Sequence, residues 1–219
     1  MPTQLPPDQV IYYFLNDLGK ILEYTEFQER WLEEEYRRYD NHIRSDTDEE
    51  WDRYGNRRNL SASLSMIFPQ LGRHSLVVYL YSLLEDSLNQ FCFSLEVERK
   101  LQTSLGDAKK KGLKRAKHYI VKNTDIDFPS SSREWQYACD MRLLRDKLVH
   151  TLGHLDNPKD AHLRKFVERT SGLSTRSFAG EEIQIQIESF FVEEACGHLE
   201  RLANKILNAY RKSKKVSYG

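Results

Sequence analysis

The sequence predicts an all-α fold, a helical bundle of about five to seven helices with a long N-terminal helix and one short extended segment. Several long stretches repeat apolar residues with the 3.6-residue period of an amphipathic helix. The apolar–polar alternation of a strand occurs over residues 181–189. Charged residues make up 30% of the chain and hydrophobic residues 39%, a balance that suits amphipathic helices better than a thick two-sided sheet.

The first helix is predicted from Asp8, which can serve as its N-cap. Its apolar stripe consists of Val10, Phe14, Leu18, Leu22 and Phe27. A polar connection follows over residues 45–59. With 219 residues the chain is expected to form a single domain, 1–219, in which 1–60 are a helical extension and 70–212 the core.

Residues 61–68 are expected to form a short helix that stops at Pro69, because proline interrupts helices. The helix predicted over 73–101 is the most apolar in the chain. Its main face carries Leu76, Leu80, Leu84, Leu88, Phe91 and Leu95, widened by Tyr79, Leu83 and Cys92. We therefore expect a central helix that is packed on more than one side.

Residues 107–123 hold the densest positive charge, with seven Lys or Arg residues at positions 109, 110, 111, 114, 115, 117 and 122. Two interpretations stay open for this basic segment. It is either a solvated helix face or a surface that contacts nucleic-acid phosphates.

The next helix is predicted to start near residue 132, because Ser131 and Glu134 have the spacing of a capping box. Its predicted core face consists of Trp135, Ala138, Met141, Leu148 and Leu152. Gly153 is expected to end it. A final amphipathic helix with a basic end is predicted after Ser189.

Overall composition restricts the classes of function. Thirty-three basic and thirty-three acidic residues cancel, so nucleic-acid binding requires a local basic surface. The three cysteines lie far apart in apolar helical patterns, which favours buried free thiols over a disulfide. The N-terminus lacks a signal-peptide pattern, and the longest apolar run is too short to span a bilayer. We expect a soluble, cytoplasmic protein without membrane contact.

The stretch MRLLRDKLVHTLGHL (141–155) places Arg145, Asp146 and His150 in an otherwise apolar helix. Asp146 and His150 are four residues apart, so they lie one turn from each other on one helix face. In the last turn the helix dipole favours a protonated His150, and the Asp146 carboxylate could orient its ring. A histidine can take the proton from a ribose 2′-OH, and an arginine can stabilise charge on the phosphate.

Spacing alone does not identify such a site, because Arg37 and His42 repeat it within a highly charged segment that reads as a solvated helix face. A structural alternative also remains open for Arg145. In that interpretation it pairs with Glu85 or Asp86 of the central helix.

The motif Arg145-Asp-Lys-Leu-Val-His150, after a long apolar helix of the type LVVYLYSLLEDSLNQF, resembles the HEPN superfamily over roughly residues 70–212. The resemblance implies an all-α, metal-independent RNase that forms a homodimer, with two motif helices meeting in one composite site. It implies roles in defence or toxin–antitoxin systems, where an antitoxin or another regulatory protein is a possible partner.

On this reading the catalytic residues are His150 as general acid/base, Arg145 on the phosphate, and Asp146 orienting the histidine or the RNA. The predicted RNA-backbone contacts are Arg142, Lys147, Lys114, Arg115 and Lys117. No cofactor is expected, and no metal, because the acid of an H-E-x-x-H site is missing between His150 and His154. The alternative function is a catalytically inactive HEPN-like helical dimer that acts as an adaptor or RNA-binding module.

Overall fold

The structure is a computed structural model that describes residues 4–45, 60–108, 110–156, 158–178 and 182–216. Within these ranges the chain forms six α-helices: α1 (Pro7–Ser45), α3 (Phe68–Arg99), α4 (Leu113–Asn123), α5 (Arg133–Thr151), α6 (Ala161–Arg169) and α7 (Phe191–Val216). A π-helical turn (Ser63–Ile67) leads into α3, and a 3-10 turn (Leu105–Asp107) precedes α4. The predicted all-α bundle with a long N-terminal helix is confirmed.

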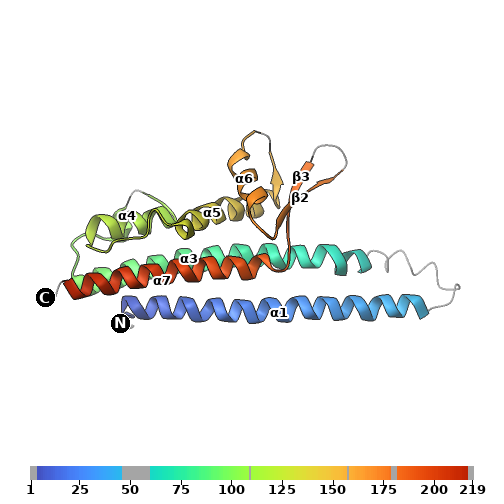
Figure 1. The fold of residues 1–219 in the computed structure, drawn as a ribbon, viewed down its shortest axis with the longest axis horizontal. Helices are drawn as coiled ribbons and strands as arrows, with labels where there is room; N and C mark the ends of the chain where they lie inside the picture. The colour runs from blue at the N-terminus through green and yellow to red at the C-terminus, as the bar shows by residue number, and fades with distance from the viewer. Residues whose placement is uncertain (1–3, 46–59, 109, 157, 179–181, 217–219) are drawn as a thin grey trace.

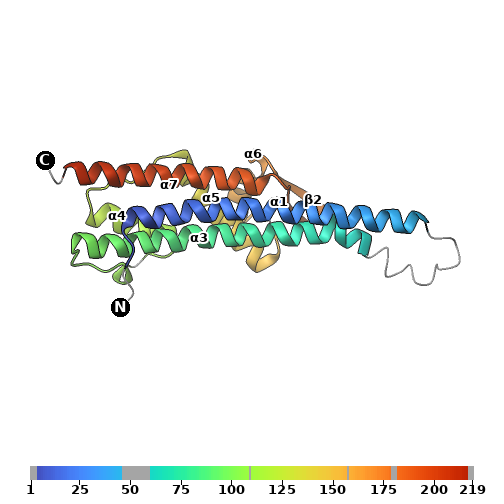
Figure 2. The same ribbon diagram turned by 90° about the horizontal axis from the view of Figure 1, so that it is seen from below.

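The helices lie in three layers (Figure 1). Helix α1 forms one outer layer and packs on both α3 and α7, which form the middle layer. Both middle helices also contact α5, which lies with α4, α6 and the strands on the opposite side. Seen from below, α1 runs alongside α3 over most of its length and alongside α7 over its N-terminal half (Figure 2). The helix that carries the Arg145–His150 motif therefore rests on the central layer.

A small antiparallel sheet covers one end of α5. It consists of β1 (His154–Leu155), β2 (Leu173–Phe178) and β3 (Glu182–Ile187), in the order β1-β3-β2. The extended segment predicted over 181–189 corresponds to β3, whereas the sequence analysis missed the other two strands. Only two residues separate the end of α5 from the start of β1, so the sheet fixes the direction in which the chain leaves this helix.

The central helix has the predicted core face, since Leu76, Leu80, Leu84, Leu88, Phe91 and Leu95 are all buried. Tyr79 was wrongly included in it, because 55% of this residue is exposed. Helix α3 contacts α1, α5 and α7, but Tyr79 lies at an open hollow between α1 and α3, where neither helix covers it. The predicted stop at Pro69 is also wrong. This proline lies in the first turn of α3, where a missing N–H breaks no helical hydrogen bond.

The predicted stripe of α1 is right at its start and wrong at its end. Val10, Phe14 and Leu18 are buried, whereas Phe27 is 58% exposed. Steps of four residues advance 400°, about 40° more than a full turn, so such a stripe winds away from the core. Ile21 and Leu32 follow the buried direction instead and contribute to it. The polar connection at 45–59 falls almost wholly outside the described residues.

Candidate functional site

Helix α5 presents the motif at its C-terminal end. It starts after Ser132, whose side chain accepts a hydrogen bond from the Trp135 N–H, one residue later than the capping box predicted. Of the predicted core face, Trp135, Ala138, Met141 and Leu148 are buried and anchor the helix on the central layer. Leu152 was wrongly assigned to this face. It follows the last helical residue in a left-handed conformation and is 63% exposed.

His150 lies in the last turn of α5 with an exposed side chain. Within the described residues, no hydrogen bond or ion pair occupies its ring. Val149 and Leu152, both at least half exposed, lie beside it. The motif histidine is thus accessible, with one exposed apolar residue on each side of it in sequence.

Arg145 is held from two sides. Its Nη1 donates to Oδ1 of Asp146 over 2.8 Å, and its Nη2 lies 3.8 Å from Oε2 of Glu85 on α3. Its guanidinium carbon lies 4.8 Å from the centre of the Tyr81 ring. The buried Nε has no partner within the described residues. The contact with Glu85 is the one that the structural alternative requires, although 27% of the Arg145 side chain stays exposed.

Asp146 faces two arginines of its own helix, Arg142 and Arg145. Besides Arg145, its carboxylate lies 3.9 Å from Nη1 of Arg142. No hydrogen bond joins it to His150 in the described part of the chain. In this single chain, therefore, Asp146 positions Arg145 and not the imidazole.

Lys147 is engaged in a structural ion pair. Its ammonium lies 2.7 Å from Asp160 and 3.1 Å from Asp156, and only 12% of the side chain is exposed. Burial by itself lowers the pKa of Lys147, but the hydrogen bonds to Asp160 and Asp156 outweigh it and raise that pKa above its usual value. The contact ties α5 to the segment before α6.

Three of the predicted RNA contacts come together on the outer face of α4 and α5. Burial raises the pKa of the Cys139 thiol, and the positive charges of Lys114, Lys117 and Arg142 act against it, so these cations lie around Cys139. Lys114 is exposed, and the Lys117 ammonium lies 5.6 Å from the centre of the Trp135 ring. We call Lys114, Lys117 and Arg142 the basic surface.

The basic surface continues along α5 toward the motif. At 100° per residue, Arg142, Asp146 and His150 fall within about 80° of one another around the helix axis. Arg115 does not belong to this surface, because its Nη2 donates to Oδ1 of Asn89 over 3.1 Å and its Nε is buried. Within the described part of the basic segment, Lys114 thus faces solvent, Lys117 lies over the Trp135 ring and Arg115 packs on α3.

The sequence analysis missed a second group of polar residues, around Asp140. This carboxylate is only 1% exposed and accepts hydrogen bonds from Gln136 on its own helix and from Arg169 on α6. Its Oδ1 also lies 2.8 Å from Nε2 of His162. In sequence Asp140 reads as one more polar residue of an amphipathic helix, and only its contacts with α6 reveal its role.

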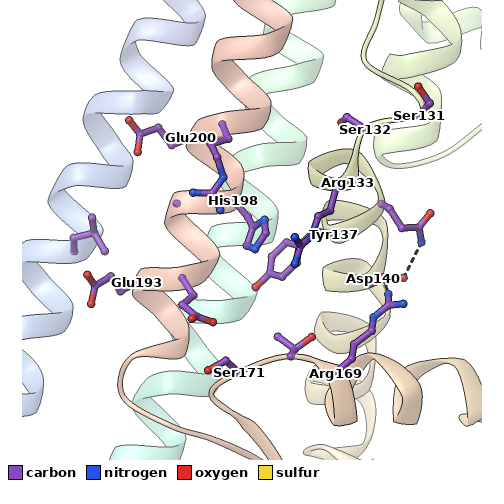
Figure 3. A pocket seen from close by; sticks show the side chains of 16 residues that line it. Ser131, Ser132, Arg133, Tyr137, Asp140, Arg169, Ser171, Glu193, His198 and Glu200 are labelled. Carbon is purple, nitrogen blue, oxygen red and sulfur yellow. Dashed lines mark hydrogen bonds and ion pairs between the residues drawn. The ribbon is translucent and has the colours of Figure 1, made fainter.

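Asp140 lies at the edge of a hollow of about 1060 Å³ lined by α5, α7, the end of α6 and Leu22 of α1 (Figure 3). His198, which reads in the sequence as an isolated surface histidine, stacks on Tyr137 in this hollow with ring centres 4.0 Å apart. We call it the α5–α7 hollow.

Other sequence predictions concern residues outside these two regions. All three cysteines carry free thiols, with Cys92 and Cys196 buried and Cys139 partly so. In the described ranges, no three His, Cys, Asp or Glu side chains gather in a geometry that could hold a metal ion. Nor does any helix in those ranges combine the length and apolarity needed to cross a membrane. Arg37 pairs with Glu33 on a solvated face, while the His42 side chain lies outside what is described.

No protein-family model, no curated protein and no solved structure matches this chain. Its function is therefore inferred from its own side chains.

Proposed function

We propose that this chain is a metal-independent endoribonuclease of the HEPN type, which cleaves RNA through the ribose 2′-OH. The observation that carries the proposal is the exposed imidazole of His150, without a side-chain partner in the described residues and five positions after Arg145. An imidazole at this open position can both accept and return a proton.

In the proposed reaction, neutral His150 takes the proton of the 2′-OH, and the 2′ oxygen attacks the adjacent phosphorus. The bond from phosphorus to the 5′ oxygen breaks, and that oxygen receives a proton from a protonated imidazole. The products are a 2′,3′-cyclic phosphate and a 5′-hydroxyl end. Arg145 donates hydrogen bonds to the phosphate oxygens while charge develops on them.

A homodimer would supply the second imidazole. Val149 and Leu152 leave an uncovered apolar surface beside His150, on which a second copy could pack. Its His150 would then protonate the leaving oxygen while the first takes the 2′ proton. A regulatory partner such as an antitoxin stays a prediction of the resemblance, and a cytoplasmic location stays a prediction of the sequence.

The basic surface is proposed to hold the RNA backbone, since phosphate contacts position a strand without reading its sequence. Lys114, Lys117 and Arg142 are the contacts we retain. Lys147 and Arg115 are engaged within the protein, so we expect them to contribute less to RNA binding.

The second candidate function is an inactive helical adaptor. It is favoured by the contacts of Arg145 with Glu85 and Tyr81, which would hold this side chain in place for purely structural reasons. The adaptor retains the fold and the apolar surface around Leu152, but it cleaves no RNA.

The two functions are separated by cleavage of a mixed RNA substrate in EDTA. We expect wild-type chain to cleave, and Arg145→Ala and His150→Ala to lose at least about 100-fold in rate, the scale of general acid–base catalysis. Arg37→Ala and His42→Ala are matched controls, because they remove the same residue types at the same spacing. Equal rates for wild type and His150→Ala would reject the RNase proposal, and inactivity of all chains would favour the adaptor.

A further inference from the structure

A second hollow, of about 700 Å³, lies between α1 and α3. Tyr24 borders it from α1, and Leu71 and Tyr79 border it from α3. The ring of Tyr81, two residues after Tyr79, contacts Arg145 of the motif. Residues two apart in a helix point in directions about 160° apart. The α1–α3 hollow therefore opens on the side of α3 that faces away from the proposed catalytic site.

Small residues form the floor of this hollow. Gly72 lines it beneath Gln28, and a β-carbon on Gly72 would overlap Nε2 of Gln28. Ser75, one turn further along the same side of α3, is exposed and lines the hollow as well. The recess is thus built into the contact between the two helices, at positions where the sequence places no large side chain.

Large apolar side chains surround the α1–α3 hollow. Tyr24, Phe27 and Trp31 fall within about 60° of one another around α1. Helix α3 adds three apolar residues within about 80°. All six are 41–58% exposed, and in Figure 2 no described helix lies over this part of α1 and α3. We call the six residues the α1–α3 face: Tyr24, Phe27, Trp31, Phe68, Leu71 and Tyr79.

The α1–α3 face is large enough for a stable contact between two proteins. A whole aromatic side chain contributes about 200 Å², so five that are about half exposed leave about 500 Å² of apolar surface in water. One partner in an interface of standard size contributes about 800 Å², of which about 60% is apolar. The exposed apolar area of the face therefore matches what one copy contributes to such an interface.

The charge around the hollow suits contact with an identical surface. Asp17 and Lys20 are the charged residues that line it, and they pair with each other over 2.9 Å. A two-fold contact brings a surface against a copy of itself, so a net charge on it would meet the same charge. Helix α1 as a whole has nine acidic and five basic residues, a balance that repels a phosphate backbone. Another copy of the chain thus fits this face better than RNA does.

We propose that two copies of this chain associate through the α1–α3 face about a two-fold axis. In such a contact the same surface supplies both the protrusions and the recess that receives them. Phe27 and Trp31 each lie within one turn of a residue that lines the hollow, Tyr24 or Gln28. The exposed rings of each copy fill the hollow of the other. The contact joins α1 and α3 of both copies into a bundle of four helices.

This contact is separate from the homodimer proposed at His150, and it does not depend on RNA cleavage. Helices α1 and α5 lie in opposite outer layers of the fold, so each contact leaves the other surface open (Figure 1). A closed assembly that uses both contacts is a tetramer, and one that uses only the α1–α3 face is a dimer. In either case, loss of the α1–α3 contact halves the mass of the assembly.

The test measures the mass of the full chain by sedimentation equilibrium. Concentrations extend to about 100 μM, above the weakest affinity expected for an interface of this size. The double variant Tyr24→Lys with Trp31→Lys should have half the wild-type mass, with a dissociation constant raised at least about 100-fold. It removes two aromatic anchors and brings four ammonium groups together. Because both residues are half exposed, the circular dichroism of the variant should equal that of wild type.

Two single variants complete the test. Tyr79→Ser removes an aromatic ring from α3 without adding charge, and should raise the dissociation constant about 10-fold. Val121→Lys is the control, because it replaces an exposed apolar residue of α4, away from the face. It should have the wild-type mass.

Three results would overturn the proposal. The first is a monomeric wild-type chain at the highest concentration, and the second is an unchanged mass in the double variant. The third is a mass that falls in Leu152→Asn but in neither Tyr79→Ser nor the double variant, which would assign the association to the motif surface alone. Cleavage of RNA by His150→Ala would reject the RNase proposal and leave the mass measurements as they are, so the two proposals fail independently.

Discussion

The Nη2 atom of Arg145 lies 3.8 Å from Oε2 of Glu85, across the contact between α5 and α3. Arg145 thus has a carboxylate partner on another helix in addition to Asp146 on its own. In the proposed RNase a phosphate must compete with these carboxylates for the guanidinium. In the adaptor, the same contact only fastens the two helices together.

Glu85→Gln should therefore raise the cleavage rate in EDTA by up to about fivefold, because the substitution removes a negative charge that competes with the phosphate. The free energy of unfolding should fall by no more than about 1 kcal/mol, since the pair is partly exposed. Rates on a mixed RNA and urea unfolding measure the two effects. Asp86 is the other carboxylate that the sequence offered as a partner of Arg145. Asp86→Asn should change neither the cleavage rate nor the free energy of unfolding. If Glu85→Gln loses activity while remaining folded, Glu85 assists the reaction instead of restraining Arg145.

Leu152→Asn should weaken self-association and cleavage without unfolding the chain. Leu152 has φ +52°, a left-handed conformation that costs a β-carbon residue energy and that Asn tolerates better. We expect the free energy of unfolding of the monomer to rise by about 0.5 kcal/mol. Loss of the apolar side chain should weaken the association of two copies. Light scattering measures the self-association, and denaturant unfolding measures the stability of the monomer. Lys100→Asn, at φ +50°, is the control. It should stabilise the chain without changing the oligomeric state that light scattering measures. Unchanged dimerisation of Leu152→Asn would place the interface elsewhere.

Lys114→Gln should weaken RNA binding to a similar degree for all sequences, because a phosphate contact carries no base readout. The slope of log K against log salt should become shallower by about 0.7, the value for one phosphate of a single strand. Fluorescence anisotropy at several salt concentrations, with catalytically silent His150→Ala as background, measures both quantities. Lys20→Gln removes an exposed lysine of α1, which pairs with Asp17, and should leave the slope as it is. A slope that does not respond to Lys114→Gln would exclude this lysine from the RNA interface.

The ion pair of Glu134 and Lys205 predicts a loss of stability in acid. The hydrogen bond from Lys205 is the main cause that lowers the pKa of Glu134 from 4.5 to about 2. A carboxyl group with a lowered pKa in the folded state stabilises it above pH 4.5, and that contribution disappears as the pH falls toward 2. Lys205→Met should thus lower the free energy of unfolding by up to about 1 kcal/mol at pH 6, with the difference from wild type shrinking below pH 4.5. A difference that stays constant from pH 6 to 2.5 would contradict this.

The 3.6-residue period of apolar residues correctly identified the buried face of the central helix α3. The Leu76–Leu95 face of α3 could be predicted because its apolar residues recur with the helical period and this helix packs against α1, α5 and α7. Phe27 and Tyr79 could not be placed in the same way. Their exposure depends on whether a neighbouring helix lies in the direction of the side chain, and periodicity holds no information about neighbours.

The sequence by itself determined that Arg145, Asp146 and His150 share one end of one helix, because α-helical geometry fixes the relation between residues four or five positions apart. Tertiary packing decided how each is used within the chain. It placed Glu85 beside Arg145 and two carboxylates beside Lys147, and it left His150 open. It also formed the α5–α7 hollow, because nothing in the sequences of these helices predicts that they lie side by side. Ion pairs between residues of different helices depend on how the helices pack in space. The spacing of residues within one helix does not determine that packing.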